Sequence, residues 1–256
     1  MKPSTLASLT LIVLFLSADP AVAFRNSDPA KASCVGCHTI TREEAAAVLR
    51  GIADNVTAVA PGPFPGVWEV DAAVEGKIIP LYLDYSKKYF IQAQFIRLSD
   101  KANITRLRYE DLNRVDVSSI PLKNAILLGN PSSKRRIIVL TDPSCPYCVK
   151  LHGEIKKAIA KDPEAAFYIM PYPRNRNDKA TYEKCQAATC DKSGKLLDDA
   201  FSGKALSPPT CGNEAVEETI RLSQRLQTQG TPSMILPDGR LIGGFREADE
   251  LLSLTR

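Results

Sequence analysis

The hydrophobic pattern of the first half of the chain changes from helical to alternating. Thr41 and Glu44 have the spacing of a capping box, and residues 45–52 are mostly good helix formers, which predicts a helix. A bend rich in proline and glycine follows at 61–66. Beyond the bend, the sequence predicts a meander of three short β-prone runs, at 67–74, 78–83 and 89–98. The pattern therefore indicates a small α+β unit.

A second pattern begins at residue 134, where strand-like and helix-like stretches alternate. An apolar, β-branched run at 136–140 precedes a helical run at 150–160 and a strand at 165–171. A long helical insertion, another helix, two short strands and a last helix complete the order, at roughly 178–201, 213–227, 233–236, 240–243 and 247–254. A β-α-β start followed by a β-hairpin and a helix is the order of a thioredoxin-like fold.

The stretch between these two patterns, residues 101–133, is predicted to be a linker. It contains one short helix-like piece around 109–115 and ends in a run of turn-forming residues at 129–133. A length of 256 residues also suits two domains of ordinary size. We therefore predict an α+β protein of two domains, the first at 41–100 and the second at 134–256.

The N-terminus has the features of a secretory signal peptide at residues 1–23. Lys2 supplies the positive charge, the apolar run at 6–16 is too short to span a bilayer, and the small residues at 21–23 suit cleavage. A single uncleaved anchor is the alternative. Export would place the seven cysteines in an oxidising compartment. The net charge of +4 is spread along the chain, so it gives no reason to expect nucleic-acid binding.

The candidate chemistry lies at Cys145 and Cys148, where the predicted strand turns into a helix. A cysteine at a helix N-terminus faces unpaired N–H groups and the positive end of the helix dipole, and both favour the thiolate. The thiolate attacks a disulfide, and a second thiol nearby can resolve the mixed disulfide that forms. We therefore predict a redox pair in which Cys145 attacks and Cys148 resolves.

Cys190 and Cys211 are the predicted structural pair among the other cysteines. Their disulfide would close a loop of about twenty residues and add roughly 3 kcal/mol of stability by the chain-entropy estimate. Cys185 and Cys190 could not easily be bridged on one helix, because five residues of rise separate the Cα atoms by more than about 7 Å. Cys185 is therefore a small buried hydrophobe or the alternative partner of Cys211. The spacing of Cys185 and Cys190 does not supply the second half of a zinc site beside Cys145 and Cys148.

A second C-x-x-C lies in the polar segment at 24–40. Cys34, Cys37 and His38 fit the pattern of covalent c-type haem attachment, in which two thiols bond the haem vinyl groups and an imidazole ligates the iron. An ordinary disulfide or a second dithiol pair fits the same spacing. The sequence therefore leaves haem c at Cys34 and Cys37 open.

Several motifs occur in one order along the chain: Thr141-Asp142, Cys145-Pro146-Tyr147-Cys148, Lys150-Leu151-His152, Cys190 with Asp198-Asp199 and Gly203-Lys204, Pro209-Thr210-Cys211, and Gly230-Thr231-Pro232. In order and spacing they resemble the periplasmic disulfide isomerases of the DsbC/DsbG family. The resemblance covers about residues 40–256. It implies a cystatin-like N-terminal dimerisation domain, a linker, and a thioredoxin-like α/β catalytic domain with a helical insertion. The segment at 34–38 departs from the well-known members.

The resemblance also implies a periplasmic, V-shaped homodimer whose dithiol chemistry needs no cofactor. Its partners would be misfolded or wrongly disulfide-bonded exported proteins and a membrane thiol reductant of the DsbD type. It implies a cis Thr231-Pro232 bond whose backbone pairs with an extended client, next to Pro146 and Tyr147.

In thioredoxin a buried aspartate lies beneath the active cysteines; here Val139 has the matching position, six residues before Cys145. The sequence therefore shows no obvious base for Cys148.

His152 lies four residues after Cys148, on the same face of the predicted helix. We interpret this histidine as a packing or solvent-exposed residue in preference to a catalytic one, because nothing else in the sequence marks it as a base. For the whole chain, the sequence predicts a thiol-disulfide isomerase that reshuffles non-native disulfides. The alternatives are a reductase of sulfenylated or haem-apoprotein cysteines and, in a different class, a haem c electron carrier or chaperone.

Overall fold

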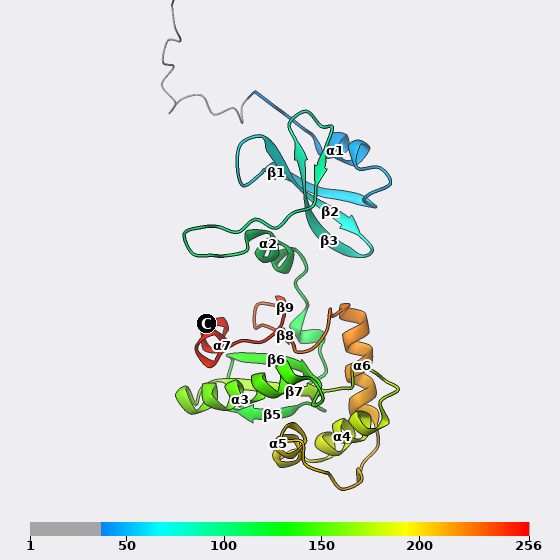
Figure 1. Ribbon diagram of the computed structural model, residues 1–256, viewed down its shortest axis with the longest axis vertical. Helices are drawn as coiled ribbons and strands as arrows, with labels where there is room; N and C mark the ends of the chain where they lie inside the picture. Colours follow the sequence, from blue (N-terminus) through cyan, green and yellow to red (C-terminus); the bar gives the residue numbers. More distant parts are fainter. Residues whose placement is uncertain (1–36, 256) are drawn as a thin grey trace, which may run out of the picture. The chain divides into compact units, whose positions relative to one another are not determined.

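The structure is a computed structural model in which residues 37–255 are described. The predicted signal peptide and Cys34 lie outside these residues. The described chain forms two β-sheets, one of four strands and one of five (Figure 1). Among residues 37–255, no helix combines the length and the apolar character that crossing a membrane requires.

The first sheet is an antiparallel meander preceded by a short helix. Helix α1 (Arg42–Val48) begins with the predicted capping box, in which Thr41 and Glu44 each accept a hydrogen bond from the backbone of the other. The strands pair in the order of the chain: β1 (Asn55–Pro61), β2 (Val67–Val74), β3 (Lys77–Asp84) and β4 (Phe90–Ile91). Their core includes Trp68, whose ring centroid lies 4.7 Å from that of Tyr85.

Two predictions for this sheet need correction. Strand β1 was not predicted, and it pairs with β2 with one register shift between Val56 and Ala58. The strand expected at 89–98 is reduced to the two residues of β4, because only Phe90 and Ile91 find partners on β3. A pattern of β-prone residues does not supply the neighbouring strand that a ladder of hydrogen bonds requires.

The stretch expected to be a linker is more ordered than its composition indicated. It contains α2 (Ile104–Leu112), capped by the side chain of Asn103, and the 3-10 turn η2 (Val117–Ser119). It also contains β5 (Ile126–Gly129), which pairs with a strand of the second sheet. The second sheet therefore takes one edge strand from residues 101–133.

The second sheet has the strand order β5-β7-β6-β8-β9. Strands β6 (Arg136–Thr141) and β7 (Ala166–Pro171) are parallel and are joined by helix α3 (Pro146–Lys161), while every other pairing is antiparallel. The hairpin of β8 (Ser233–Ile235) and β9 (Leu241–Gly243) and the helix α7 (Ala248–Leu254) follow at the end of the chain. The predicted β-α-β start and final hairpin are thus present.

The helical insertion consists of separate helices and not of one long helix. Helix α4 (Lys179–Cys190) ends before Gly194, whose φ of 81° begins a new helix, α5 (Lys195–Phe201). Helix α6 (Glu214–Leu226) follows. A left-handed glycine breaks the helical path, which the helical composition of 178–201 did not reveal.

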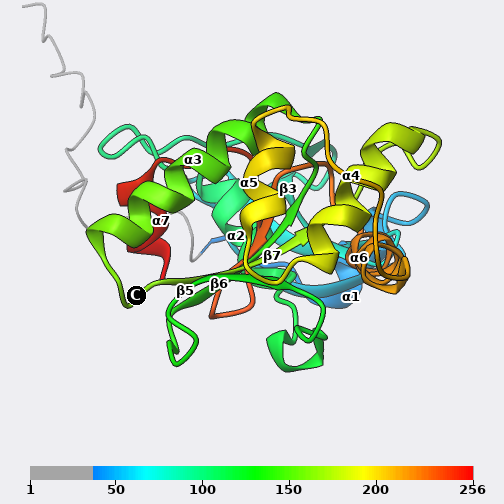
Figure 2. The ribbon, with the colours of Figure 1, turned by 90° about the horizontal axis from the view of Figure 1, so that it is seen from below.

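The side chains of β6 alternate between two hydrophobic clusters, one on each face of the second sheet. Ile137 and Val139 join the cluster that contains residues of α3, α5 and α7, whereas Ile138 and Leu140 join the cluster with α6. Figure 2 shows α3 and α5 on one side of these strands. Both cysteines of the C-x-x-C motif belong to the first cluster. The dithiol is therefore built into the core of the sheet.

Candidate functional site

Cys145 lies at the junction between β6 and α3. It is the N-cap residue of the helix, and Pro146 occupies the first helical turn, where a missing N–H has no cost. The side chain of Cys145 makes no capping hydrogen bond. Backbone N–H groups at this helix end are thus available to stabilise a negative charge on the Cys145 sulfur.

Hydrogen bonds to Asp142 stabilise the turn that precedes Cys145. The buried Asp142 carboxylate accepts hydrogen bonds from the backbone N–H of Ser144 at 2.7 Å and from the Ser144 hydroxyl at 2.6 Å. It also accepts the backbone N–H of Arg174 at 2.9 Å and faces the Arg174 guanidinium at 3.3 Å. A buried carboxylate that accepts several hydrogen bonds fixes the loop around it.

The sequence analysis assigned no role to Ser144 and Arg174. The spacing Asp142-x-Ser144 is that of a local Asx turn, and this signal could have been found in the sequence. The contact between Asp142 and Arg174 could not have been found in the sequence, because it joins residues 32 positions apart.

The surroundings of Cys145 favour its thiolate. Cys145 is only 2% exposed, and in its protonated form its thiol donates to the carbonyl oxygen of Thr231 at 3.4 Å. Burial opposes ionisation, but the backbone N–H of Cys148 and the side chains of Thr231 and Cys148 outweigh it, so the pKa of Cys145 lies below its ordinary value. Cys145 is therefore the better nucleophile of the pair.

The surroundings of Cys148 favour its thiol. Burial raises the pKa of Cys148 to about 11, although the Thr141 side chain and the backbone N–H of Asp142 act in the opposite direction. That N–H lies 3.5 Å from the Cys148 sulfur. Because the two cysteines have opposite preferences, a thiolate forms more readily at Cys145 than at Cys148.

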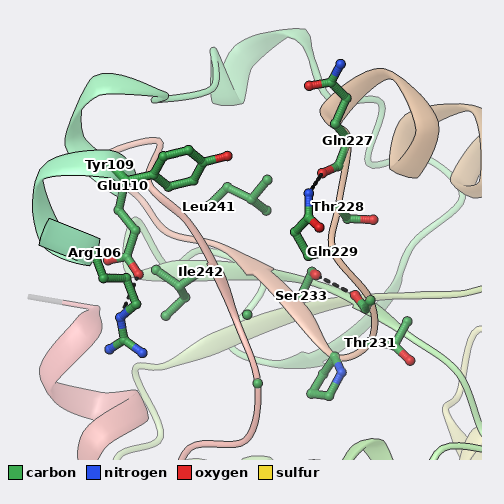
Figure 3. Close-up of a pocket in the computed structure, with 14 residues that line it drawn as sticks. Arg106, Tyr109, Glu110, Gln227, Thr228, Gln229, Thr231, Ser233, Leu241 and Ile242 are labelled. Atoms are coloured by element: carbon green, nitrogen blue, oxygen red, sulfur yellow. Dashed lines mark hydrogen bonds and ion pairs between the residues drawn. The ribbon is translucent and has the colours of Figure 1, made fainter. Parts of the chain in front are cut away.

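Thr231 and Pro232 form the opposite wall of the site. The peptide bond between them is cis, as the resemblance implied. The Thr231 hydroxyl is buried without a conventional hydrogen bond, and its proximity favours the thiolate of both cysteines. Figure 3 shows the loop that presents Thr231, in which the Ser233 hydroxyl donates to the Gly230 carbonyl at 2.6 Å. The structure thus brings together residues that are 86 positions apart in the sequence.

The rim of the site is partly exposed and apolar. Tyr147, between the two cysteines, is 61% exposed, and the Lys150 ammonium lies 5.8 Å from the centre of its ring. Val149 is also exposed. An exposed aromatic ring beside a nucleophilic sulfur is available for contact with another protein chain.

The other cysteines divide into a closed pair and separate thiols. Cys190 and Cys211 form a disulfide with an S–S distance of 2.05 Å, which joins the end of α4 to the segment before α6. Cys185 is buried and free, so it is not the partner of Cys211. Cys37 is free and exposed. The described part of the chain contains no cluster of three or more histidine, cysteine, aspartate or glutamate residues that could hold a metal ion.

Comparison with known proteins agrees with the thioredoxin-like fold. A family model of the thioredoxin-like domain matches residues 122–256, more than half of the chain. The chain therefore belongs to the thioredoxin-like family. The chain is also 28% identical over 175 residues to the thiol:disulfide interchange protein DsbC of Escherichia coli K12, covering 67% of this chain and 70% of that one.

Further relatives carry similar names. The probable thiol:disulfide interchange protein DsbC of Bordetella avium is 27% identical over 191 residues, covering 74% of this chain and 65% of the relative. The chain thus spans just under two thirds of that relative's length. A solved structure of a disulfide interchange protein from Neisseria gonorrhoeae has 25% identity and a TM-score of 0.46, covering 53% of this chain and 96% of that one.

Proposed function

We propose that this protein is a thiol-disulfide isomerase that acts through Cys145 and Cys148. The observation that carries the proposal is the opposite pKa shift of the two thiols, downward at Cys145 and upward at Cys148. A pair of this kind can attack a disulfide with one thiolate while its second thiol remains in reserve. The names of the DsbC relatives support the same chemistry.

The reaction begins when the Cys145 thiolate attacks one sulfur of a client disulfide. A bond forms between Cys145 and that sulfur, the client disulfide breaks, and the other client sulfur leaves as a thiolate. That thiolate can attack a different client disulfide, which forms a new client disulfide and releases another client thiolate. The released thiolate attacks the client sulfur bonded to Cys145, and Cys145 leaves as a thiolate, which completes isomerisation with no net change in oxidation. Alternatively Cys148 displaces the client, which leaves the client reduced and the Cys145–Cys148 pair oxidised.

The remaining elements of the proposal concern partners and location. An extended client segment would bind beside Thr231 and Pro232 and against Pro146 and Tyr147, and the exposure of Tyr147 supports this contact. A DsbD-type membrane thiol reductant would return an oxidised pair to the dithiol. The sheet at 41–100 would form a homodimer in the periplasm, after removal of the signal peptide. Non-native disulfides of exported proteins would be the substrates.

Haem attachment remains a prediction. It needs two thiols and an imidazole, and only Cys37 and His38 of this set lie among the described residues. The dithiol chemistry itself needs no cofactor.

Reduction of sulfenylated cysteines would use the same Cys145 thiolate, and turnover on a sulfenylated peptide compared with a scrambled disulfide substrate separates the two activities.

Refolding of scrambled ribonuclease tests the proposed function. The protein in its reduced form should restore ribonuclease activity, and Cys145→Ala should lower the rate to that of the uncatalysed reaction. Cys37→Ser is the matched control, because it removes an exposed cysteine elsewhere in the chain. Activity that survives Cys145→Ala would refute the mechanism.

A further inference from the structure

The resolving step of the proposed function leaves a proton without an acceptor. Cys148 must become a thiolate to displace a bound client, yet its pKa is about 11. An isolated thiol with this pKa is ionised to only about one part in ten thousand at pH 7. Val139, the residue of β6 in the position where thioredoxin has an aspartate, is buried and apolar. Another group must therefore assist if resolution is to be efficient.

His152 is a titratable side chain that lies one helical turn after Cys148. It follows Cys148 by four residues on α3, so the two side chains lie one above the other on the same helix face. Side chains of a helix lean toward its N-terminus, which directs the imidazole back toward Cys148. Both side chains line one small internal gap, and the other described residues that line it are Thr141 and apolar side chains. Cys148 and His152 are thus the titratable groups of this gap.

The imidazole is held firmly and is almost completely buried. His152 is 7% exposed, and its ring stacks on Phe201 of α5 with centroids 4.4 Å apart and an interplanar angle of 16°. Its Nε2 atom lies 2.6 Å from Oδ1 of Asp198, also on α5. Its Nδ1 atom is buried and has no hydrogen-bond partner among the described residues. Unpartnered buried nitrogen atoms are rare, which points to a role for Nδ1.

The contact with Asp198 determines which nitrogen is the base. Burial opposes ionisation of Asp198, but hydrogen bonds from Lys156 and His152 prevail and lower the pKa of its carboxyl, so Asp198 is a carboxylate at neutral pH. A carboxylate can only accept, so Nε2 of His152 carries the hydrogen. The free lone pair of the neutral ring is therefore on Nδ1.

The ring is neutral at pH 7 before the reaction. Burial lowers the pKa of His152, and Asp198 only partly reverses this effect. The charged groups that act on the ring are Asp198 of α5 and Lys156 of α3, whose ammonium lies 2.8 Å from Oδ2 of Asp198. A neutral imidazole with one free nitrogen can accept a proton, and the carboxylate then stabilises the imidazolium.

We propose that His152, oriented by Asp198, accepts the proton of Cys148 when Cys148 resolves the mixed disulfide. The proton moves from the Cys148 sulfur to Nδ1 of His152, and the thiolate attacks the Cys145 sulfur. The Cys145–Cys148 bond forms, the bond between Cys145 and the client breaks, and the client sulfur leaves as a thiolate that takes a proton from solvent. The imidazolium then returns its proton to water, and its partner Asp198, whose side chain is 42% exposed, connects the buried ring to solvent.

A timed acid-quench experiment separates this role from simple packing. The reduced protein is mixed with a peptide that contains one disulfide, and mass spectrometry quantifies the reduced protein, the mixed disulfide and the oxidised protein. In His152→Gln, we expect the mixed disulfide to decay at least about tenfold more slowly at pH 7, while its formation rate changes less than about twofold. The decay rate of the variant should rise about tenfold per pH unit up to pH 9, whereas the wild-type rate should vary far less above the pKa of His152.

Two further variants keep the test decisive. Asp198→Asn, at a partly exposed site, should slow decay of the mixed disulfide severalfold with little effect on its formation, even if His152→Gln folds poorly. Lys157→Gln changes an exposed residue of the same helix and should leave both rates unchanged. Decay at the wild-type rate in both His152→Gln and Asp198→Asn would overturn the inference. So would equal slowing of formation and decay, which is the result of a purely structural role.

The same data distinguish this inference from the proposed function on which it rests. A wild-type protein that forms no mixed disulfide with the peptide contradicts the proposed function itself. Normal formation, combined with decay that ignores His152 and Asp198, contradicts only the role of His152.

Discussion

The structure contains two cysteine pairs close to the same sheet, and they differ in every respect that controls reactivity. Cys145 and Cys148 lie three residues apart at a helix start, are buried in the core, and are free thiols. Cys190 and Cys211 are 21 residues apart, lie nearer the surface, and are bonded to each other. The first pair is surrounded by groups that shift its pKa values, while the second joins the end of one helix to a loop.

The two pairs suit different roles because they differ in sequence separation and in the groups around them. One is suited to stabilise the fold and the other to react. A disulfide across a long loop restricts the unfolded chain and so stabilises the fold. A pair on one helical turn restricts little, but the helix N-terminus and the neighbouring Thr231 favour a thiolate at Cys145. We expect the first pair to exchange with clients and the second to remain closed.

The largest effect should come from opening the closed pair. Replacing both Cys190 and Cys211 by serine should lower the free energy of unfolding by about 3 kcal/mol, because the loop of the unfolded chain is no longer restricted. Denaturant unfolding of the oxidised proteins measures this change. The alkylation rate of Cys145 in the folded variant should stay within about twofold of wild type. Loss of reactivity at Cys145 without loss of stability would reverse the roles assigned to the two pairs.

A second prediction concerns the asymmetry within the free pair. At pH 7, iodoacetamide should alkylate Cys145 at least about 100-fold faster than Cys148, since the pKa of one lies below its ordinary value and that of the other is about 11. The rate at Cys145 should rise with pH and then level off once its thiolate predominates. Mass spectrometry of quenched samples gives both rates, with exposed Cys37 as the internal reference. Similar rates at Cys145 and Cys148 would contradict the assigned attack order.

Much of this site could be predicted because its key signals are local. The apolar run of β6 and the proline after Cys145 indicate a strand that turns into a helix, and the capping box predicts α1 in the same way. The cis bond at Pro232 followed from the resemblance and not from local physics. The Cys190–Cys211 pair was predicted from the loop that it closes and from the helix geometry that disfavours a Cys185–Cys190 bridge. The thioredoxin-like order of elements was predictable from the local pattern of strand-like and helix-like stretches.

The parts that could not be predicted depend on distant contacts. His152 looked like a surface or packing residue until its partners Asp198 and Phe201, 46 and 49 positions further along, enclosed it. The role of Asp142 in the active-site turn depends on Arg174. The short β4 and the break between α4 and α5 likewise depend on pairing and on one left-handed glycine. Hydrophobic periodicity predicts the secondary structure of one segment, but it does not predict which distant segments contact each other.

The smallest expected effect tests whether Thr231 contributes to the difference between the pairs. Thr231→Val removes the hydroxyl that favours the thiolate of Cys145, so the pKa of Cys145 should rise toward its ordinary value and alkylation at pH 7 should slow by about threefold. Absorbance of the thiolate at 240 nm during a pH titration measures the pKa directly. Thr210→Val, beside Cys211, makes the same change next to the closed pair and should leave the titration unchanged. If Thr231→Val also leaves it unchanged, the low pKa of Cys145 arises from the helix N-terminus and the Cys148 contacts alone.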